Sequence, residues 1–261
     1  MIGAIIGDLA GSVYEYNQMF HFSPIRCQDS LIPSGAFYSD DTILTIAIAD
    51  AIINNTDYEN KLREYITKYQ DSVPKDKPYF KKMFSPNLLK WAETECRGNS
   101  KGNGAMMRIS PVGWLFDSEE EVIKNARLAT LPSHNSVEAI DSASKVALTI
   151  FYAKQGLKKE EVFKKLKIDI KKPSLTKFNY TCSDTIDLVF YSLAKGKDFD
   201  DCIHTALSFG GDTDTNACIV GSMAEAFYPV EKQLRDKALS LLPNEFVSII
   251  KQCEEFYENT N

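Results

Sequence analysis

Hydrophobic residues recur along this chain with the spacing of buried helices. Residues 43–53 form one dense apolar segment, and a second one follows Thr215, so each predicts a core helix. The apolar segment 1–14 has glycine at positions 3, 7 and 11. Residues four apart lie on the same face of a helix. The glycine spacing therefore predicts a first helix that packs closely against a neighbour.

Amphipathic patterns predict further helices. Residues 57–70 place Leu62, Ile66 and Tyr69 on one face and charged residues on the other. Comparable patterns predict a helix that ends at Lys154 after a cap in 133–136, a helix capped by Ser183 or Asp184, and segments 88–95, 122–131, 198–208 and 245–257. No convincing run of alternating residues predicts a strand. We therefore expect one all-α domain, 1–261, of about ten or more helices.

Three segments lack this regular pattern. Residues 17–38 predict a long loop, which is either a lid over a site or a packed surface loop. Residues 71–87 contain prolines that interrupt the helical pattern, Pro78 among them. Residues 158–172 contain seven lysines and three acidic residues, a composition typical of a solvated helix and linker.

Composition limits the classes of partner. The chain has 261 residues, of which 44% are hydrophobic, enough for a substantial core. A net charge of −6 argues against a protein that coats nucleic acid or an anionic membrane. We find neither a signal peptide nor an apolar run near the roughly 20 residues of a membrane span, so we expect a cytoplasmic protein. For a domain of this size we expect a monomer. Cysteines at 27, 96, 182, 202, 218 and 253 have no metal-site spacing and are expected to be small buried residues.

Paired carboxylates open both core helices. The two motifs are Ser39-Asp40-Asp41-Thr42 and Gly210-Gly211-Asp212-Thr213-Asp214-Thr215. Each motif alone is explained by N-capping, since Ser, Thr and Asp are favoured at helix starts. If the motifs meet in the fold, their four carboxylates repel one another unless cations or raised pKa values compensate. Spacing does not decide whether they meet. Oxygen ligands of this kind favour Mg²⁺ or Mn²⁺ over zinc.

Four other features have both a structural and a functional interpretation. We expect Asp8 to be a buried, hydrogen-bonded carboxylate. Glu15 follows the first helix and, from the residues alone, is a surface glutamate. The loop Gly102-Asn103-Gly104 either presents backbone N–H groups to a phosphate or forms a tight turn. His134 precedes a helix and is typical of a capping or core histidine.

Five motifs together resemble the ADP-ribosylglycohydrolase family and occur in the family's order. They are Gly7-Asp8 with Glu15, Ser39-Asp40-Asp41-Thr42, Gly102-Asn103-Gly104-Ala105 with Met107-Arg108, Ser133-His134, and Gly210-Gly211-Asp212-Thr213-Asp214-Thr215. The resemblance covers nearly the whole chain. It implies a compact orthogonal helical domain with a central dinuclear metal site.

The resemblance also implies roles for residues. Two divalent cations, Mg²⁺ or Mn²⁺, would be bound by Ser39, Asp40, Asp41, Asp212, Asp214 and Thr215, with Asp214 bridging the two. The catalytic residues would be Glu15, Asp40 and Asp214, with Glu15 as general acid or base. ADP-ribose would contact Gly102, Asn103, Gly104 and His134. The family often has threonine where Ser39 stands, and serine keeps the hydroxyl without the methyl group that stiffens the side chain.

The implied reaction is metal-dependent hydrolysis of the glycosidic bond between ADP-ribose and an acceptor, with free ADP-ribose as product. The acceptor would be a protein side chain, a nucleic acid or a small molecule, and the sequence does not distinguish them. Two other classes stay open. One is a non-catalytic ADP-ribose-binding protein. The other, from the residues alone, is a two-metal phosphohydrolase.

Overall fold

The computed structural model describes residues 1–26, 30–77, 81–94 and 96–260. Within these ranges the secondary structure is helical, apart from two isolated antiparallel bridges, Asn99 with His134 and Gly102 with Thr181. The helices are α1 (Ile2–Gly11), α2 (Glu15–Phe20), α3 (Asp40–Ile53), α4 (Tyr58–Tyr69), α5 (Pro86–Ala92), α6 (Gly104–Met107), α7 (Ser110–Leu115), α8 (Glu119–Thr130), α9 (Val137–Lys154), α10 (Lys159–Lys165), α11 (Cys182–Lys195), α12 (Phe199–Ser208), α13 (Thr213–Ala224), α14 (Lys232–Ser240) and α15 (Asn244–Thr260). The all-α prediction is confirmed.

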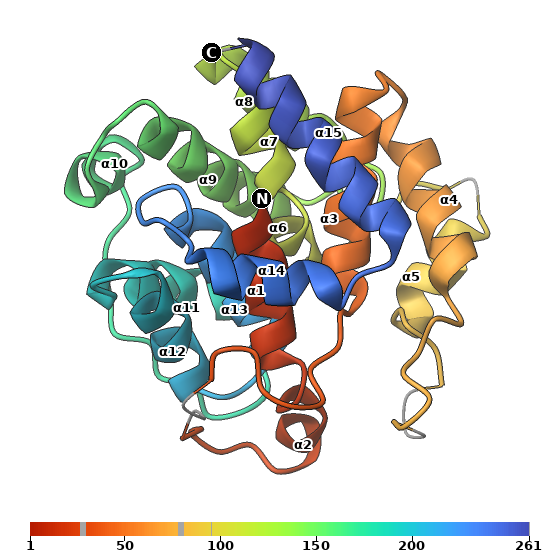
Figure 1. Ribbon diagram of the computed structural model, residues 1–261, viewed down its shortest axis with the longest axis horizontal. Helices are drawn as coiled ribbons and strands as arrows, with labels where there is room; N and C mark the ends of the chain where they lie inside the picture. Colours follow the sequence, from red (N-terminus) through yellow and green to blue (C-terminus); the bar gives the residue numbers. More distant parts are fainter. Residues whose placement is uncertain (27–29, 78–80, 95, 261) are drawn as a thin grey trace.

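Helices α1 and α13 form the centre of the fold (Figure 1), and every residue of both is buried. Their backbones touch because α1 has no side chain at three contact points. A Cβ atom added at Gly3, Gly7 or Gly11 would lie 2.3, 2.0 or 2.3 Å from a backbone atom of α13. The close packing predicted from the glycine spacing is confirmed.

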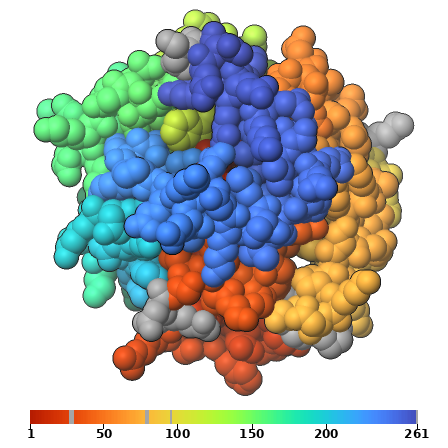
Figure 2. Space-filling view, viewed as in Figure 1, coloured from red at the N-terminus to blue at the C-terminus, as the bar shows by residue number. Residues whose placement is uncertain are grey.

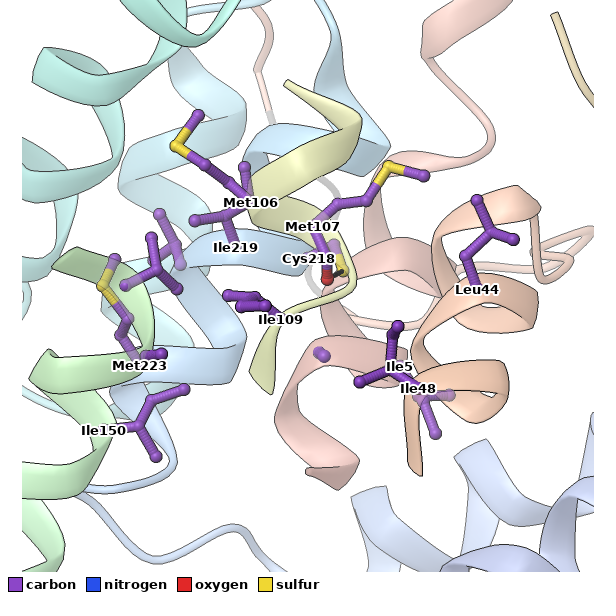
Figure 3. Close-up of a cluster of buried hydrophobic side chains, with 14 of the residues drawn as sticks. Ile5, Leu44, Ile48, Met106, Met107, Ile109, Ile150, Cys218, Ile219 and Met223 are labelled. Carbon is purple, nitrogen blue, oxygen red and sulfur yellow. Dashed lines mark hydrogen bonds between the residues drawn. The ribbon is translucent and has the colours of Figure 1, made fainter. Parts of the chain in front are cut away.

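The apolar core surrounds the short helix α6. Figure 3 shows side chains from α1, α3, α9 and α13 gathered around Met106, Met107 and Ile109. On the outside, α14 crosses over α1 and α15 packs against α3 (Figure 1), and in the space-filling view these C-terminal helices cover the middle of the same face (Figure 2). The core therefore joins residues from both ends of the chain.

Several predicted boundaries are wrong. Helix α1 ends at Gly11 rather than at residue 14, and after a short turn Glu15 begins α2. The turn forms because the Ser12 hydroxyl donates to Leu9 O and accepts a hydrogen bond from Phe37 N. The predicted loop 17–38 consequently starts inside a helix. Within it Ile32 is fully buried, so this part packs on the core instead of forming a lid.

Three helices start at other residues than predicted, and four short ones were not predicted. Helix α8 starts at Glu119, three residues before the predicted start. Helix α11 is capped by Thr181, whose hydroxyl accepts from Asp184 N at 3.2 Å, rather than by Ser183 or Asp184. Helix α5 starts at Pro86 after a Ser85 cap, two residues before the predicted start. Helices α2, α6, α7 and α14 escaped prediction, because the first three have only six, four and six residues and α14 buries only Ala238. The predictions on Cys27, Pro78 and Glu95 concern residues outside the described ranges.

The cysteine prediction is confirmed at four positions and wrong at one. Cys182, Cys202, Cys218 and Cys253 are buried thiols, whereas Cys96 is exposed. Across the described ranges, no helix has both the length and the apolar character needed to cross a membrane.

Candidate active site

A cavity of about 800 Å³ opens where the first turns of α2, α3 and α13 meet. Each of these helices supplies carboxylates to the wall: Glu15 from α2, Asp40 and Asp41 from α3, and Asp212 and Asp214 from the start of α13. The two motifs that sequence spacing could not connect therefore face the same space. The contact arises because α1 packs against both α3 and α13.

The carboxylates form two overlapping groups. In the first, oxygens of Asp8, Asp41 and Asp214 lie within 4.8 Å of one another, and in the second, oxygens of Glu15, Asp212 and Asp214 do so. Asp214 belongs to both groups. Asp40, an expected metal ligand, lines the cavity but belongs to neither group. Asp8, which was not an expected ligand, belongs to the first group.

Asp8 links α1 to the start of α3. Its Oδ2 accepts hydrogen bonds from the backbone N–H of Ser39 at 2.9 Å, from that of Thr42 at 3.1 Å, and from the Thr42 hydroxyl. The expectation of a buried, hydrogen-bonded carboxylate is confirmed. Its other oxygen, Oδ1, is buried and, among the described residues, has no hydrogen-bond partner. Oδ1 of Asp41 is in the same situation.

The donor set fits hard divalent cations. Two buried carboxylate oxygens without partners are costly unless something positive satisfies them. The carboxylates of both groups supply oxygen alone, the ligand that Mg²⁺ and Mn²⁺ prefer. The Thr215 hydroxyl adds a further oxygen and donates to Asp41 Oδ2 at 3.3 Å.

Burial and mutual repulsion raise the proton affinity of the cluster. Burial, reinforced by the charge of Asp214, raises the pKa of Asp8 to about 7 and that of Asp40 to about 8. Burial also raises the pKa values of Glu15, Asp41 and Asp214 well above their usual range, and the charges of neighbouring carboxylates raise them further. The buried group thus favours protons or cations over free negative charge.

The capping interpretation holds for one motif and fails for the other. Ser39 caps α3, because its hydroxyl accepts from Asp41 N at 3.2 Å. Asp212 stands at the cap position of α13 but makes no side-chain capping bond. Its Oδ2 instead accepts a hydrogen bond from Asn103 Nδ2 at 2.6 Å. Asp212 is therefore held by a different segment of the chain rather than used to start its own helix.

The glycine loop borders the same cavity. Gly102, Asn103, Gly104 and His134 all line it. The amide of Asn103 supports Asp212, as described above, and its backbone oxygen accepts from Met106 N at 2.8 Å at the start of α6. His134 lies against the two glycines, since its Nε2 would be 3.5 and 3.4 Å from Cβ atoms added at positions 102 and 104.

Buried amides that the sequence did not single out shape the Gly210-Gly211 turn. Both glycines have positive φ angles, +71° and +78°. Gln18 Oε1 accepts from Gly211 N at 3.2 Å, and Asn179 Oδ1 accepts from Asp212 N at 3.0 Å. The Asn179 amide also donates to Asn216 Oδ1 at 2.8 Å. Neither Gln18 nor Asn179 belongs to a motif, so no sequence signal identified them.

Fold and cavity together define an all-helical protein with a buried carboxylate site suited to divalent cations. The chain belongs to the ADP-ribosylglycohydrolase family, whose model matches residues 1–260.

Individual relatives are distant. ADP-ribosylhydrolase ARH3 of Mus musculus is 25% identical over 62% of this chain and 50% of its own length. The ARH3 of Danio rerio is 23% identical over 88% of this chain and 82% of its own length. This chain thus spans about half the length of the mouse relative it matches. A solved structure named as an ADP-ribosylglycohydrolase-related protein complex aligns with a TM-score of 0.72 at 20% identity, over 98% of this chain and 96% of that one.

Proposed function

We propose that this protein is a metal-dependent hydrolase that cleaves the glycosidic bond between ADP-ribose and an acceptor and releases free ADP-ribose. One observation supports this most strongly: in a chain of this family, Asp214 is common to two carboxylate groups at the wall of a cavity of about 800 Å³. A cavity of that volume is in the range that binds nucleotide-sized ligands.

Two divalent cations, Mg²⁺ or Mn²⁺, would be held between the two motifs. The proposed ligands are Ser39, Asp40, Asp41, Asp212, Asp214 and Thr215, and the grouping of oxygens adds Asp8 and Glu15 to the candidates. Asp214 is the proposed bridging ligand, which its membership of both groups supports. When bound, such a pair supplies positive charge that orients ribose hydroxyls and lowers the pKa of water.

Glu15 is the proposed general acid or base, and Asp40 and Asp214 would complete the catalytic set. Glu15 begins α2, half-buried at the cavity wall. Burial and the charges of Asp214 and Asp212 raise its pKa well above the usual range, which favours the protonated form that a general acid needs. Proposed contacts to ADP-ribose come from Gly102, Asn103, Gly104 and His134, which border the same cavity.

The experiment is turnover of ADP-ribosylated substrates linked through arginine, serine and nucleic acid, with Mg²⁺, Mn²⁺ or EDTA, and with free ADP-ribose as the readout. We expect metal-dependent release from one linkage, which would also identify the acceptor. Binding of ADP-ribose without release from any substrate would favour a binding protein. Release of AMP or phosphate would favour a phosphohydrolase.

Two variants test the carboxylates directly. Asp40→Ala and Asp212→Ala should abolish turnover while the circular dichroism spectrum stays that of a folded helical protein. Asp57→Ala is the matched control: Asp57 caps α4 away from the cavity, so activity should be unchanged and stability reduced by about 1 kcal/mol. Full activity in either of the first two variants would refute the metal assignment.

A further inference from the structure

Arg108 is a cation buried behind the glycine loop. It directly follows α6, and its side chain is completely buried. One guanidinium nitrogen, Nη2, lies 2.7 Å from Ser133 Oγ and 3.4 Å from Ala129 O. Its Nε and Nη1 have no hydrogen-bond partner among the described residues. A buried guanidinium is costly unless its donors find acceptors, so the few contacts that Arg108 makes have a large energetic effect.

The contacts of Arg108 determine the direction of the hydrogen bonds around it. A guanidinium can only donate, so Ser133 Oγ must accept from Nη2. The same Oγ lies 2.8 Å from Nδ1 of His134. Within the described ranges, this nitrogen is the one acceptor that the contacts offer to the Ser133 hydroxyl hydrogen. If Nδ1 carried the proton, Oγ would accept from both Arg108 and His134, and its own hydrogen would have no acceptor in these contacts. The arrangement that satisfies every group has the hydroxyl donating to a lone pair on Nδ1.

Arg108 also acts on the ring directly. Its Nη2 lies 3.5 Å from Nδ1 of His134, so a second donor is directed at the same nitrogen. This longer contact adds to the one from the Ser133 hydroxyl, and a proton on Nδ1 would also lie close to the positive charge of Arg108. Burial, and then the charge of Arg108, lower the pKa of His134 well below its usual range, so the ring is neutral. A neutral ring that accepts at Nδ1 has its proton on Nε2.

The Nε2 edge faces the cavity. Nε2 lies 3.5 and 3.4 Å from the positions where side chains at Gly102 and Gly104 would begin, and His134 lines the cavity wall. Because these two residues have no side chain, the space in front of Nε2 is left for a ligand. An N–H there is a donor, and the group that it meets must be an acceptor such as a phosphate or ribose oxygen.

We propose that Arg108 and Ser133 are positioning residues that hold His134 as the Nε2-protonated tautomer, so that it donates a hydrogen bond to an acceptor oxygen of the ligand. The second half of this statement rests on the proposed function, because it assumes that ADP-ribose occupies the cavity. The first half concerns the protein alone.

The test of the tautomer is long-range ¹H–¹⁵N correlation spectroscopy on the full chain labelled at histidine nitrogen. The chain has three histidines, so the signals of His134 are assigned by their loss in His134→Gln. In the wild type we expect a protonated Nε2 and an unprotonated Nδ1. In Ser133→Ala the hydroxyl donor at 2.8 Å is absent and only the longer contact of 3.5 Å from Arg108 remains, so we expect a measurable fraction of the Nδ1-protonated form. Ser133→Thr keeps the hydroxyl and should retain the wild-type pattern.

The matched control is Ser192→Ala in α11, which removes a buried hydroxyl that has no hydrogen-bond partner in the described part of the chain. It should leave the His134 signals unchanged. A protonated Nδ1 in the wild type, or an unchanged tautomer in Ser133→Ala, would overturn the proposal. Arg108→Met should shift the tautomer in the same direction as Ser133→Ala. If that variant does not fold, Ser133→Ala still decides.

A second readout tests the donor. Calorimetric titration with ADP-ribose should give a Kd about fivefold to tenfold higher in Ser133→Ala, as expected for one weakened hydrogen bond, with wild-type affinity in Ser133→Thr and Ser192→Ala. Equal affinity in wild type and Ser133→Ala would overturn the donor role. Since the tautomer is measured without ligand, a chain that neither binds nor releases ADP-ribose contradicts the proposed function and leaves the tautomer result standing.

Discussion

Replacement of Gly7 by alanine tests whether the contact between α1 and α13 determines both stability and the site. The added Cβ would lie 2.0 Å from Ala217 O, whereas ordinary contact begins at 3.4 Å, so the two atoms overlap by about 1.4 Å. Both atoms belong to buried helices, and no rotamer change can relieve the overlap. Overpacking of a core usually costs about 1–3 kcal/mol. We expect about 3 kcal/mol or more, which is a fall in Tm of roughly 6–12 °C for a chain of this size.

The same change should weaken metal binding. At Gly11 the backbone of α1 also touches Asp214, so helices pushed apart at Gly7 carry Asp214 away from Asp8. The assay is thermal unfolding followed by circular dichroism, with EDTA and with Mn²⁺. In Gly7→Ala we expect a lower Tm and a smaller stabilisation by Mn²⁺ than in the wild type.

Gly156→Ala makes the same chemical change without the overlap. Among the described residues, apart from Gly156 and its chain neighbours, no atom lies within 4 Å of the new Cβ, but the φ angle of Gly156 is +86°. The strain should cost about 1–2 kcal/mol and leave the Mn²⁺ response unaltered. If Gly7→Ala unfolds within about 2 °C of the wild type, the helices have room to spare, and the reasoning from backbone contact is wrong.

Two further predictions concern the carboxylates and their supports. In protein stripped of cations, the pKa values of Asp8 (about 7) and Asp40 (about 8) lie above the value of about 3.9 in the unfolded state. The folded state therefore binds more protons than the unfolded state between these values. The stability that results is complete below about pH 4 and is lost as the pH rises towards 8. Tm in EDTA should therefore fall between pH 5 and 8 and recover with Mn²⁺, and a flat or rising profile would contradict the shifts. Asn179→Ala removes the acceptor of Asp212 N and should raise the apparent Kd for Mn²⁺ about tenfold. Asn125, half-buried in α8, contacts Tyr58 and Glu121, and Asn125→Ala should not change this Kd. Equal Kd values for wild type and Asn179→Ala would exclude a positioning role for Asn179.

The sequence by itself determined the helical class, most of the longer helices and the close packing of the first one. These features depend on residues three or four positions apart, so periodicity and the Gly3-Gly7-Gly11 spacing record them directly. The paired carboxylates at two helix starts were equally visible, because caps and first turns have a distinctive composition. Boundaries were less accurate where tertiary contacts decide them, as at Ser12, where Phe37 supplies the backbone N–H that completes the turn.

Only the tertiary structure decided which carboxylates meet. Gly11 and Thr213 are 202 positions apart, yet the Thr213 hydroxyl donates to Gly11 O at 2.9 Å. That contact brings Asp214 beside Asp8 and leaves Asp40 outside the closest groups. The hydrogen bonds of Asn179 to Asp212 and of Ser133 to His134 have the same origin. Local sequence specifies how each helix begins, but the side chains that share a buried space depend on how distant helices pack.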